Sequence, residues 1–237
     1  MGSALTDHRM IEEGDRLMVA VSGGKDSLTL LTILNERRKF VPVKYSLVAA
    51  HIDFGFHRSV SPKLARFCKK IGVEYVHLKV DALKNTPPEK INCFWCSWNR
   101  RKALFELAGR MKIRKICFGH HKDDIIATTL MNLFFQGEIS TMCPKQELFK
   151  GKIVILRPLA YVEETLLTRC ARQLKLPVDS CSCPHGDLSN RALAGRIIRQ
   201  VERVCPNVRT NIFRSTSRIK REYLGGAPST GMDDEEN

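Results

Sequence analysis

Short apolar runs alternate along the chain with longer segments in which hydrophobic residues recur every three or four positions. The runs have the length of buried strands, and the longer segments have the spacing of amphipathic helices. The pattern predicts strands at residues 16–21, 45–52, 74–80, 115–119 and 152–159. It predicts helices at residues 27–39, 62–71, 97–111, 123–136 and 162–176. Because strands that alternate with helices need crossover connections, we expect an α/β fold with a parallel sheet covered by helices on both faces.

From Leu188 onward the strand pattern stops. Two segments at residues 188–204 and 208–223 are expected to be helical, and they are rich in arginine and lysine. A polar stretch follows and contains the acidic residues 233–236. The chain therefore divides into an α/β domain at residues 1–187, a basic helical extension at residues 188–224, and a tail at residues 225–237 that we expect to be disordered.

The composition is that of a globular protein with a strongly basic surface. The 237 residues are 43% hydrophobic and 27% charged, which is enough apolar material for a full α/β core. The formal net charge of +14 favours a polyanionic partner such as a nucleic acid, although a soluble basic protein without such a partner has the same charge. No apolar run approaches the roughly 20 residues that span a bilayer, and the N-terminus lacks the layout of a signal peptide. We expect a soluble, cytoplasmic protein without membrane contact.

The motif SGGKDS, at residues 22–27, lies between the first predicted strand and the first predicted helix. Gly23 and Gly24 allow a tight turn with close backbone approach, and the helix that follows presents free N–H groups to an anion. Ser22 and Ser27 add hydroxyl donors, and Lys25 adds a positive charge. The motif therefore predicts a phosphate site, and the plain alternative is a glycine turn with a simple helix cap.

The next residue of the motif, Asp26, would repel a phosphate unless it binds Mg²⁺ or caps the helix. The whole motif resembles the SGGxDS loop of the N-type ATP pyrophosphatases. That family shares the adenine nucleotide α-hydrolase-like fold, and its members cleave ATP between the α and β phosphates. The resemblance implies that ATP is bound at the glycine turn.

The carboxyl ends of the other predicted strands carry polar residues that we expect to complete a nucleotide site at the same edge of the sheet. They are His51 and Asp53 after the second strand, Gly119, His120 and Asp123 after the fourth, and Arg157 after the fifth. A neutral His120 beside Asp123 could hold a proton or orient Mg²⁺, and the planar fork of Arg157 could bind an α-phosphate. The alternatives are a surface or capping histidine and an arginine paired with a carboxylate.

The nine cysteines are an odd number in a chain expected to be cytoplasmic, which argues against a disulfide framework. Cys93 and Cys96 form a CxxC motif that we place in the loop before the helix at residues 97–111, and Cys181 and Cys183 lie in a second loop. Their thiolates suit zinc or an iron–sulfur cluster, and the spacing does not choose between them. Cys68, Cys117 and Cys170 are expected to be packing residues, whereas Cys143 and Cys205 have no evident partner.

Five stretches extend the resemblance: MIEEGDRLMVAVSGGKDSLTLL, the CxxC motif, FGHHKDDIIATTLMNLFF, ILRPLAYVEE and LPVDSC. They occur in the order found in the tRNA 2-thiocytidine synthetases, which the chain resembles from about Met10 to Phe213. In that family three cysteines hold a [4Fe-4S] cluster. The resemblance implies that Cys93, Cys96 and Cys181 are the ligands. Cys183 is the alternative to Cys181, because family members often carry CxxC where this chain has CxC.

The resemblance implies an ATP-dependent thiolation of a cytidine in the tRNA anticodon loop, at position 32 in the family. The C2 oxygen of the base would attack the α-phosphate of ATP, pyrophosphate would leave, and sulfur delivered through the cluster would displace AMP. Lys25, Asp26, His120, Asp123 and Arg157 are the implied catalytic residues. The implied partners are tRNA, contacted by the basic extension, and a sulfur donor such as a cysteine desulfurase. A homodimer is left open.

Three other functions are compatible with parts of the sequence. A related thiolase could act on uridine through a Cys93 persulfide or a cluster. A lysidine-type synthetase shares the glycine loop but does not need these cysteines. A zinc-stabilised RNA-binding protein without catalytic activity would explain the cysteines and the charge, but it would leave SGGKDS unexplained.

Overall fold

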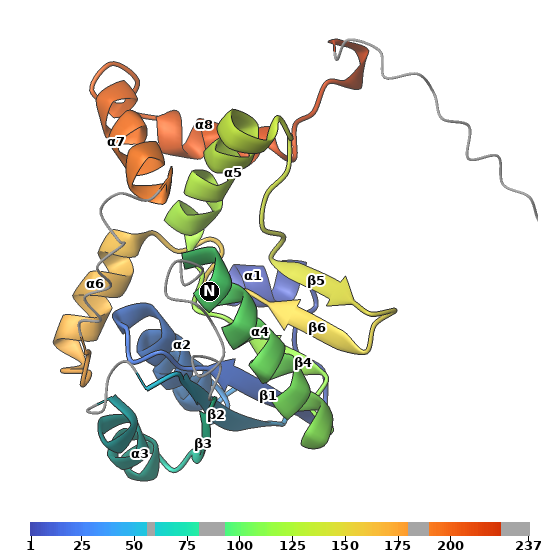
Figure 1. Ribbon diagram of the computed structural model, residues 1–237, viewed down its shortest axis with the longest axis vertical. Helices are drawn as coiled ribbons and strands as arrows, with labels where there is room; N and C mark the ends of the chain where they lie inside the picture. Colours follow the sequence, from blue (N-terminus) through green and yellow to red (C-terminus); the bar gives the residue numbers. More distant parts are fainter. Residues whose placement is uncertain (56–59, 81–92, 180–189, 224–237) are drawn as a thin grey trace, which may run out of the picture.

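The computed structural model describes residues 1–55, 60–80, 93–179 and 190–223. Its centre is a six-stranded sheet with the strand order β3-β2-β1-β4-β6-β5 (Figure 1). The strands are β1 Asp15–Ala20, β2 Tyr45–Asp53, β3 Glu74–Lys79, β4 Lys115–Cys117, β5 Lys145–Leu148 and β6 Ile153–Leu156. All neighbouring strands are parallel except β5, which pairs antiparallel with β6. The predicted α/β class is confirmed, and the sheet is mainly parallel rather than wholly so.

The edge strand β5 was not predicted. Its sequence, Lys-Gln-Glu-Leu, is polar and none of its four residues is buried. An exposed edge strand needs no apolar run, so the hydrophobic pattern carries no signal for it. The predicted strand at residues 152–159 ends earlier than expected, at Leu156.

The helices are α1 Gly2–Asp7, α2 Lys25–Arg37, α3 Val60–Ile71, α4 Cys93–Arg110, α5 Lys122–Gln136, α6 Glu164–Gln173, α7 Asn190–Glu202 and α8 Val208–Ser215. Every predicted helix is present, and α1 is additional. The predicted helix at residues 208–223 is wrong in its second half, because α8 ends at Ser215 and only a short 3₁₀ turn, Arg221–Tyr223, follows. Ser215 and Ser217 bond their hydroxyls to backbone carbonyls there, which competes with helix propagation.

The start of α4 also corrects the sequence analysis. The CxxC motif was expected in a loop, but α4 begins at Cys93 and contains Cys96. No glycine or proline separates Cys93 from Ser97, so nothing stops the helix from extending back over the motif. The CxxC motif therefore forms the first turn of a helix.

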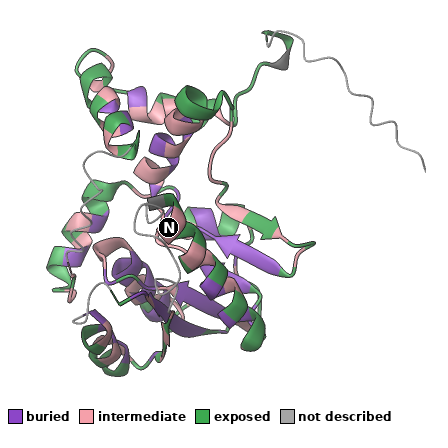
Figure 2. Cartoon of the chain, in the orientation of Figure 1, coloured by how far each residue is buried: buried purple, intermediate pink, exposed green. Residues whose placement is uncertain are grey.

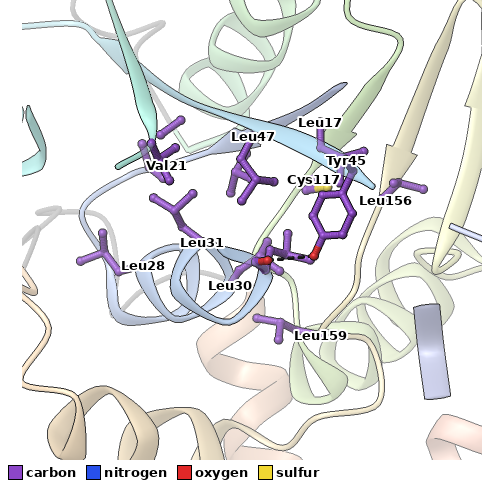
Figure 3. Close-up of a cluster of buried hydrophobic side chains, with 14 of the residues drawn as sticks. Leu17, Val21, Leu28, Leu30, Leu31, Tyr45, Leu47, Cys117, Leu156 and Leu159 are labelled. Atoms are coloured by element: carbon purple, nitrogen blue, oxygen red, sulfur yellow. Dashed lines mark hydrogen bonds between the residues drawn. The ribbon is translucent and has the colours of Figure 1, made fainter. Parts of the chain in front are cut away.

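The two faces of the sheet bury separate hydrophobic clusters. Leu17 and Leu47 point to the face covered by α1, α2, α3 and α6, and this cluster is drawn in Figure 3. Met18 and Val48 point to the opposite face, where α4 packs. The alternation follows from the pleat of the strands. Figure 2 shows that the most continuous burial lies in the sheet and the helix sides turned toward it.

Three of the nine cysteines were expected to be packing residues. Cys68 and Cys117 are fully buried, and burial raises the pKa of Cys68 to about 11 and the pKa of Cys117 to about 12. Such thiols stay protonated and do not suit a metal. Cys170 is only half-buried on α6, and Cys143 is exposed.

The C-terminal helices lie apart from the sheet. Helices α7 and α8 pack against α5, and Figure 1 shows the three together at one end of the molecule. We call α5, α7 and α8 the helical lobe. Its buried core is small and consists of Ile126, Ile198 and Val208. Within the described parts of the chain, no helix is both long enough and apolar enough to cross a membrane.

Candidate active site

The glycine turn between β1 and α2 has the geometry that the motif predicts. Gly23 adopts a φ of +90°, and a Cβ atom added there would lie 2.8 Å from Cγ1 of Val60. The Ser27 hydroxyl donates to the Gly24 carbonyl at 3.0 Å, and the Gly24 amide donates to the Ser22 hydroxyl at 3.2 Å. Gly24 is the N-cap of α2 and provides no side-chain cap. The first turn of α2 can therefore offer its N–H groups to an anion.

A second glycine brings β4 against this turn. A Cβ atom on Gly119 would lie 2.9 Å from the backbone nitrogen of Ser27 and 3.0 Å from the carbonyl carbon of Asp26. Both neighbours are backbone atoms in the first turn of a helix, so they cannot move aside easily. Only glycine lets the end of β4 approach α2 this closely.

A cleft of about 280 Å³ opens at the carboxyl ends of β1, β2 and β4. Its floor and one wall come from the strand ends and the glycine turn, including Ser22, Gly24, Asp26, Ser27 and Gly119. The opposite wall is one face of α4, with Ser97, Arg100, Arg101 and Leu104. From β1 the chain first builds the sheet outward through β2 and β3 on one side, and it then crosses to β4 on the other side. Parallel sheets bind ligands at the carboxyl ends of the strands where the strand order reverses in this way.

Two buried polar atoms at this cleft have no described partner, Oδ1 of Asp26 and Nδ1 of His120. The His120 ring stacks on Phe118 with centroids 5.6 Å apart. Burial lowers the pKa of His120 to about 4, and the nearby Arg157 and Arg101 act in the same direction. The imidazole is therefore neutral near pH 7. Buried polar atoms without partners indicate where a ligand can bind.

Lys25 is held by two carboxylates. Its Nζ lies 2.8 Å from Oε1 of Glu164 and 3.1 Å from Oδ2 of Asp26. Burial opposes its charge, but the hydrogen bonds and charges of Glu164 and Asp26 outweigh burial and raise the pKa of Lys25. Lys25 therefore keeps its positive charge beside the glycine turn.

A second cavity of about 680 Å³ adjoins the cleft and shares Asp26 and Asp124 with it. We call it the basic cavity, because α7 and α8 line it with Arg191, Arg196, Arg199 and Arg209. Two of these arginines pair with carboxylates of α5: Arg209 lies 2.6 Å from Asp123, and Arg191 contacts Asp124. These ion pairs fasten α7 and α8 to the start of α5, beside the cleft.

Asp123 is engaged through both of its oxygens. Oδ1 accepts from Arg209, and Oδ2 accepts from the backbone N–H of Glu164 at 2.8 Å. His121 lies close by, with Nδ1 3.7 Å from Asp123 and Nε2 3.9 Å from Asp26. Within the described residues, no group of three or more histidine, cysteine or acidic side chains is arranged to hold a metal ion.

The other strand-end residues do not line the cleft with their side chains. His51 and Asp53 alternate along β2 with Ala50 and Ile52, and it is Ala50 and Ile52 that line the cleft. Nδ1 of His51 donates to the Val21 carbonyl at 2.8 Å. Asp53 accepts from the Gly55 amide at 2.7 Å and from His77 at 3.1 Å.

Arg157 lies behind the cleft and is 3% exposed. Its guanidinium donates to the Cys143 carbonyl and lies 3.4 Å from Oε1 of Gln146. Burial lowers the pKa of Arg157 to about 10, and Arg101 adds to this effect. The described contacts are with the segment around β5, and they do not include the carboxylate partner that the alternative interpretation required.

The cysteines are described only in part. Cys93 begins α4, Cys96 is half-buried in the same turn, and Cys181 and Cys183 lie outside the described residues. The described chain before the second cysteine pair ends at Asp179. The Asp179 amide donates to the Gly23 carbonyl at 3.0 Å, and its carboxylate lies 2.9 Å from Nζ of Lys63. The chain that leads to the second cysteine pair is thus bonded to the glycine turn.

The sequence analysis missed several residues that line the cleft or the basic cavity. They are Ser97, Arg100 and Arg101 on α4 and Asp124 in the first turn of α5. The α4 residues lie within the helix expected at residues 97–111, where Ser97, Arg100, Arg101 and Leu104 share one face, but no local signal shows that this face turns toward the cleft. Arg191 and Arg209 belong to the predicted basic extension, but their ion pairs with Asp124 and Asp123 were not predicted.

Comparison with known proteins gives a consistent result. A family model described as a PP-loop domain matches residues 3–181. The tRNA-cytidine(32) 2-sulfurtransferase of Delftia acidovorans is 38% identical over 94% of this chain and 73% of its own length. The protein of the same name from Geobacter sulfurreducens is 36% identical over 94% of this chain and 90% of its own.

Among solved structures, the chain is similar to the U34-tRNA thiolase NcsA from Methanococcus maripaludis, which was determined with its [4Fe-4S] cluster. The TM-score is 0.73 at 24% identity, and the match covers 92% of this chain and 75% of that one. At this level of identity the similarity is one of fold.

Proposed function

The chain belongs to the tRNA-cytidine(32) 2-sulfurtransferase family of PP-loop proteins, and from this premise we propose that it replaces the C2 oxygen of cytidine 32 in tRNA with sulfur, at the expense of ATP. The observation that carries the proposal is the position of α4. The same helix begins with the CxxC motif and lines the cleft beside the glycine turn. A nucleobase in this cleft would therefore lie between bound ATP and the cysteines.

The residues of the glycine turn fit a triphosphate. Gly23 and Gly24 leave room for the pyrophosphate group, and Ser22, Ser27 and the N–H groups of α2 can donate to it. Lys25 offsets the charge that develops on the leaving pyrophosphate. Gly119 keeps β4 close enough to close the pocket. We expect the α-phosphate to face the side of the cleft formed by α4.

Asp26 and His120 carry the unpartnered atoms, and we assign them the chemical roles. Oδ1 of Asp26 would hold Mg²⁺, a hard cation that prefers carboxylate oxygens. Neutral His120 can accept or relay a proton near the reacting base. Asp123 positions α6 and α8 at the site through its two hydrogen bonds.

Three further predicted residues do not line the cleft, and we propose that they support it indirectly. Arg157 adds positive charge behind His120, which favours the phosphates of ATP in the cleft. His51 and Asp53 hold the end of β2, whose Ala50 and Ile52 line the expected adenosine side of the cleft.

Cys93, Cys96 and Cys181, with Cys183 as the alternative to Cys181, would hold the [4Fe-4S] cluster. Cys96 fits this role because it is half-buried in the first turn of α4, one helical turn from Cys93. The fully buried Cys68 and Cys117 do not fit it. When bound, the cluster supplies the sulfur chemistry of the reaction.

The domain assignment follows the same logic. Residues 1–187 form the ATP-binding part, and residues 188–224 provide the tRNA contact. Arg196 and Arg199 line the basic cavity and pair with no described carboxylate, so they are available for phosphates of the anticodon stem-loop. Residues 225–237 lie outside the described part of the chain and are proposed to be a disordered acidic tail.

Mass spectrometry of tRNA nucleosides tests the function directly. A strain without the gene should lack 2-thiocytidine, the wild-type gene should restore it, and a Cys96→Ser gene should not. Unchanged 2-thiocytidine in the deletion strain would rule out the proposal, and loss of 2-thiouridine alone would favour the uridine thiolase.

The cluster is tested by anaerobic purification. Iron and acid-labile sulfide in the wild-type protein, both lost in the Cys96→Ser variant, would support an iron–sulfur cluster. Stoichiometric zinc without sulfide, with no consumption of ATP in the presence of tRNA, would favour the zinc-stabilised RNA-binding protein.

A further inference from the structure

The first two turns of α4 expose a pair of large aromatic side chains. Phe94 is 75% exposed and Trp98 is 58% exposed. They lie four residues apart, on one side of the helix, and their rings stack with centroids 6.4 Å apart and planes inclined by 18°. Exposed aromatic pairs of this kind are uncommon on a monomeric surface and indicate a binding site.

The pair belongs to a supported aromatic layer. Trp95, between the two exposed rings in the sequence, packs against the buried Phe54 with centroids 5.9 Å apart. The guanidinium of Arg100 lies 5.6 Å from the Phe54 ring on the same helix–sheet contact. These contacts hold the first turns of α4 against the end of β2, so the exposed rings are presented from a fixed helix.

The surroundings of the pair are basic and continuous with the cleft. Ser97, the neighbour of Trp98, lines the cleft together with Arg100 and Arg101, and Lys102 follows them on α4. A partner for this surface must therefore combine flat apolar rings with negative charge. Single-stranded RNA has this combination, because its unstacked bases stack on aromatic side chains while its phosphates bind arginine and lysine.

We propose that Phe94 and Trp98 form a stacking platform for an unpaired nucleobase of the RNA substrate, next to the base that enters the cleft. This inference rests on the proposed function, since it takes an RNA loop as the substrate. The platform holds a neighbouring base outside the cleft and so helps to keep the reacting base extruded into it.

The test uses variants that separate stacking from apolar contact and from charge. Trp98→Phe keeps an aromatic ring, whereas Trp98→Leu and Phe94→Leu keep only apolar bulk. Phe40→Leu is the matched control, because Phe40 is 74% exposed and follows α2 at the opposite edge of the sheet. All three sites are on the surface, and circular dichroism and ATP binding check that each of the four variants folds.

Binding of a tRNA and of its isolated anticodon stem-loop is measured by fluorescence anisotropy over a range of salt concentrations. We expect Trp98→Leu and Phe94→Leu to bind roughly tenfold more weakly, and Trp98→Phe and Phe40→Leu to bind as the wild type does. The salt dependence should be the same for every variant, because no charge is removed.

Intrinsic fluorescence gives a second readout, because Trp95 and Trp98 are the two tryptophans of the chain. Stacking of a base should quench the emission of a Trp95→Phe variant, in which Trp98 is the sole reporter. Wild-type affinity in Trp98→Leu, with no quenching, would overturn the platform and favour a protein partner for this surface. If the wild type binds no tRNA, both the platform and the proposed function are overturned. If the wild type thiolates tRNA and Trp98→Leu binds and thiolates it equally well, only the platform is overturned.

Discussion

The sheet and the helical lobe meet at the same site but are held together by different forces. On both faces of the sheet, fully buried side chains such as Leu31 and Met18 pack in layers against helices. The lobe has only Ile126, Ile198 and Val208 at its core, and the ion pairs of Arg191 and Arg209 join α7 and α8 to the start of α5 beside the cleft. Hydrophobic burial contributes far more free energy than partly exposed ion pairs do. The nucleotide side of the site is therefore rigid, and the side with the basic cavity is more easily displaced.

This difference suits the two expected ligands. A triphosphate needs N–H groups that are already in place, and the buried sheet provides them through the glycine turn. A folded RNA is large and must enter and leave, and the weakly held lobe presents the arginines for it. The following experiments would break or sharpen the comparison, beginning with the largest expected effect.

Truncation of a side chain in the sheet core should have the largest effect on stability. Leu31→Ala removes a fully buried side chain of α2 and should lower the free energy of unfolding by about 2–5 kcal/mol. Chemical denaturation measures it, and Leu166→Ala, at a residue 55% exposed on α6, is the matched control. Ile198→Ala should loosen the packing of the lobe and leave the sheet folded. If it lowers the free energy of unfolding of the sheet as much as Leu31→Ala does, the lobe and the sheet are not stabilised separately.

Gly119→Ala should damage the nucleotide side of the site. The new Cβ must displace the backbone of Ser27 or Asp26, which costs about 1–3 kcal/mol and disturbs the first turn of α2. Titration calorimetry with a non-hydrolysable ATP analogue should show that the affinity falls by at least roughly tenfold. Gly109→Ala on α4 is the control, because nothing lies within 4 Å of its added Cβ, and it should bind the analogue normally.

The neutral state of His120 predicts a pH dependence of stability. Its pKa of about 4 in the folded protein lies below that of an unfolded histidine, so the unfolded chain takes up a proton first as the pH falls. Stability should decrease from about pH 6.5 downward and level off near pH 4. Denaturation midpoints across this range should be flatter in His120→Gln than in the wild type. His8→Gln, at the end of α1, is the control. If it flattens the pH dependence as much as His120→Gln does, the pH dependence does not come from His120 in the cleft.

Loss of the ion pairs that Arg209 of α8 makes with α5 and α7 should have the smallest effect. Arg209→Gln removes the guanidinium that Asp123 and Glu202 share, and it should weaken the attachment of α8 by about 1 kcal/mol. Hydrogen exchange of the α8 amides should become faster, and the difference from the wild type should shrink at high salt. Arg203→Gln, at an exposed arginine of the same lobe, is the control. A double-mutant cycle with Asp123→Asn that gives no coupling would show that this pair does not hold α8 against α5.

Much of the fold was predictable because its signals are local. The parallel strands and their helices were placed within a few residues, since an apolar run or a helical stripe is visible in one segment of sequence. The glycine turn was recognisable for the same reason. Strand β5 and the start of α4 were missed because neither has a local hydrophobic pattern: β5 is polar at the sheet edge, and the CxxC turn precedes the stripe of α4.

The sequence by itself determined that the chain forms an α/β sheet and that a phosphate-binding turn follows its first strand, since strand length, helical spacing and glycine placement act within a few residues. The tertiary structure alone decided which polar residues face the cleft. The pleat of β2 turns His51 and Asp53 away from it, the antiparallel edge covers Arg157, and α4 brings Arg100 and Arg101 in. These outcomes depend on strand register and on packing between distant segments, which no single stretch of sequence contains.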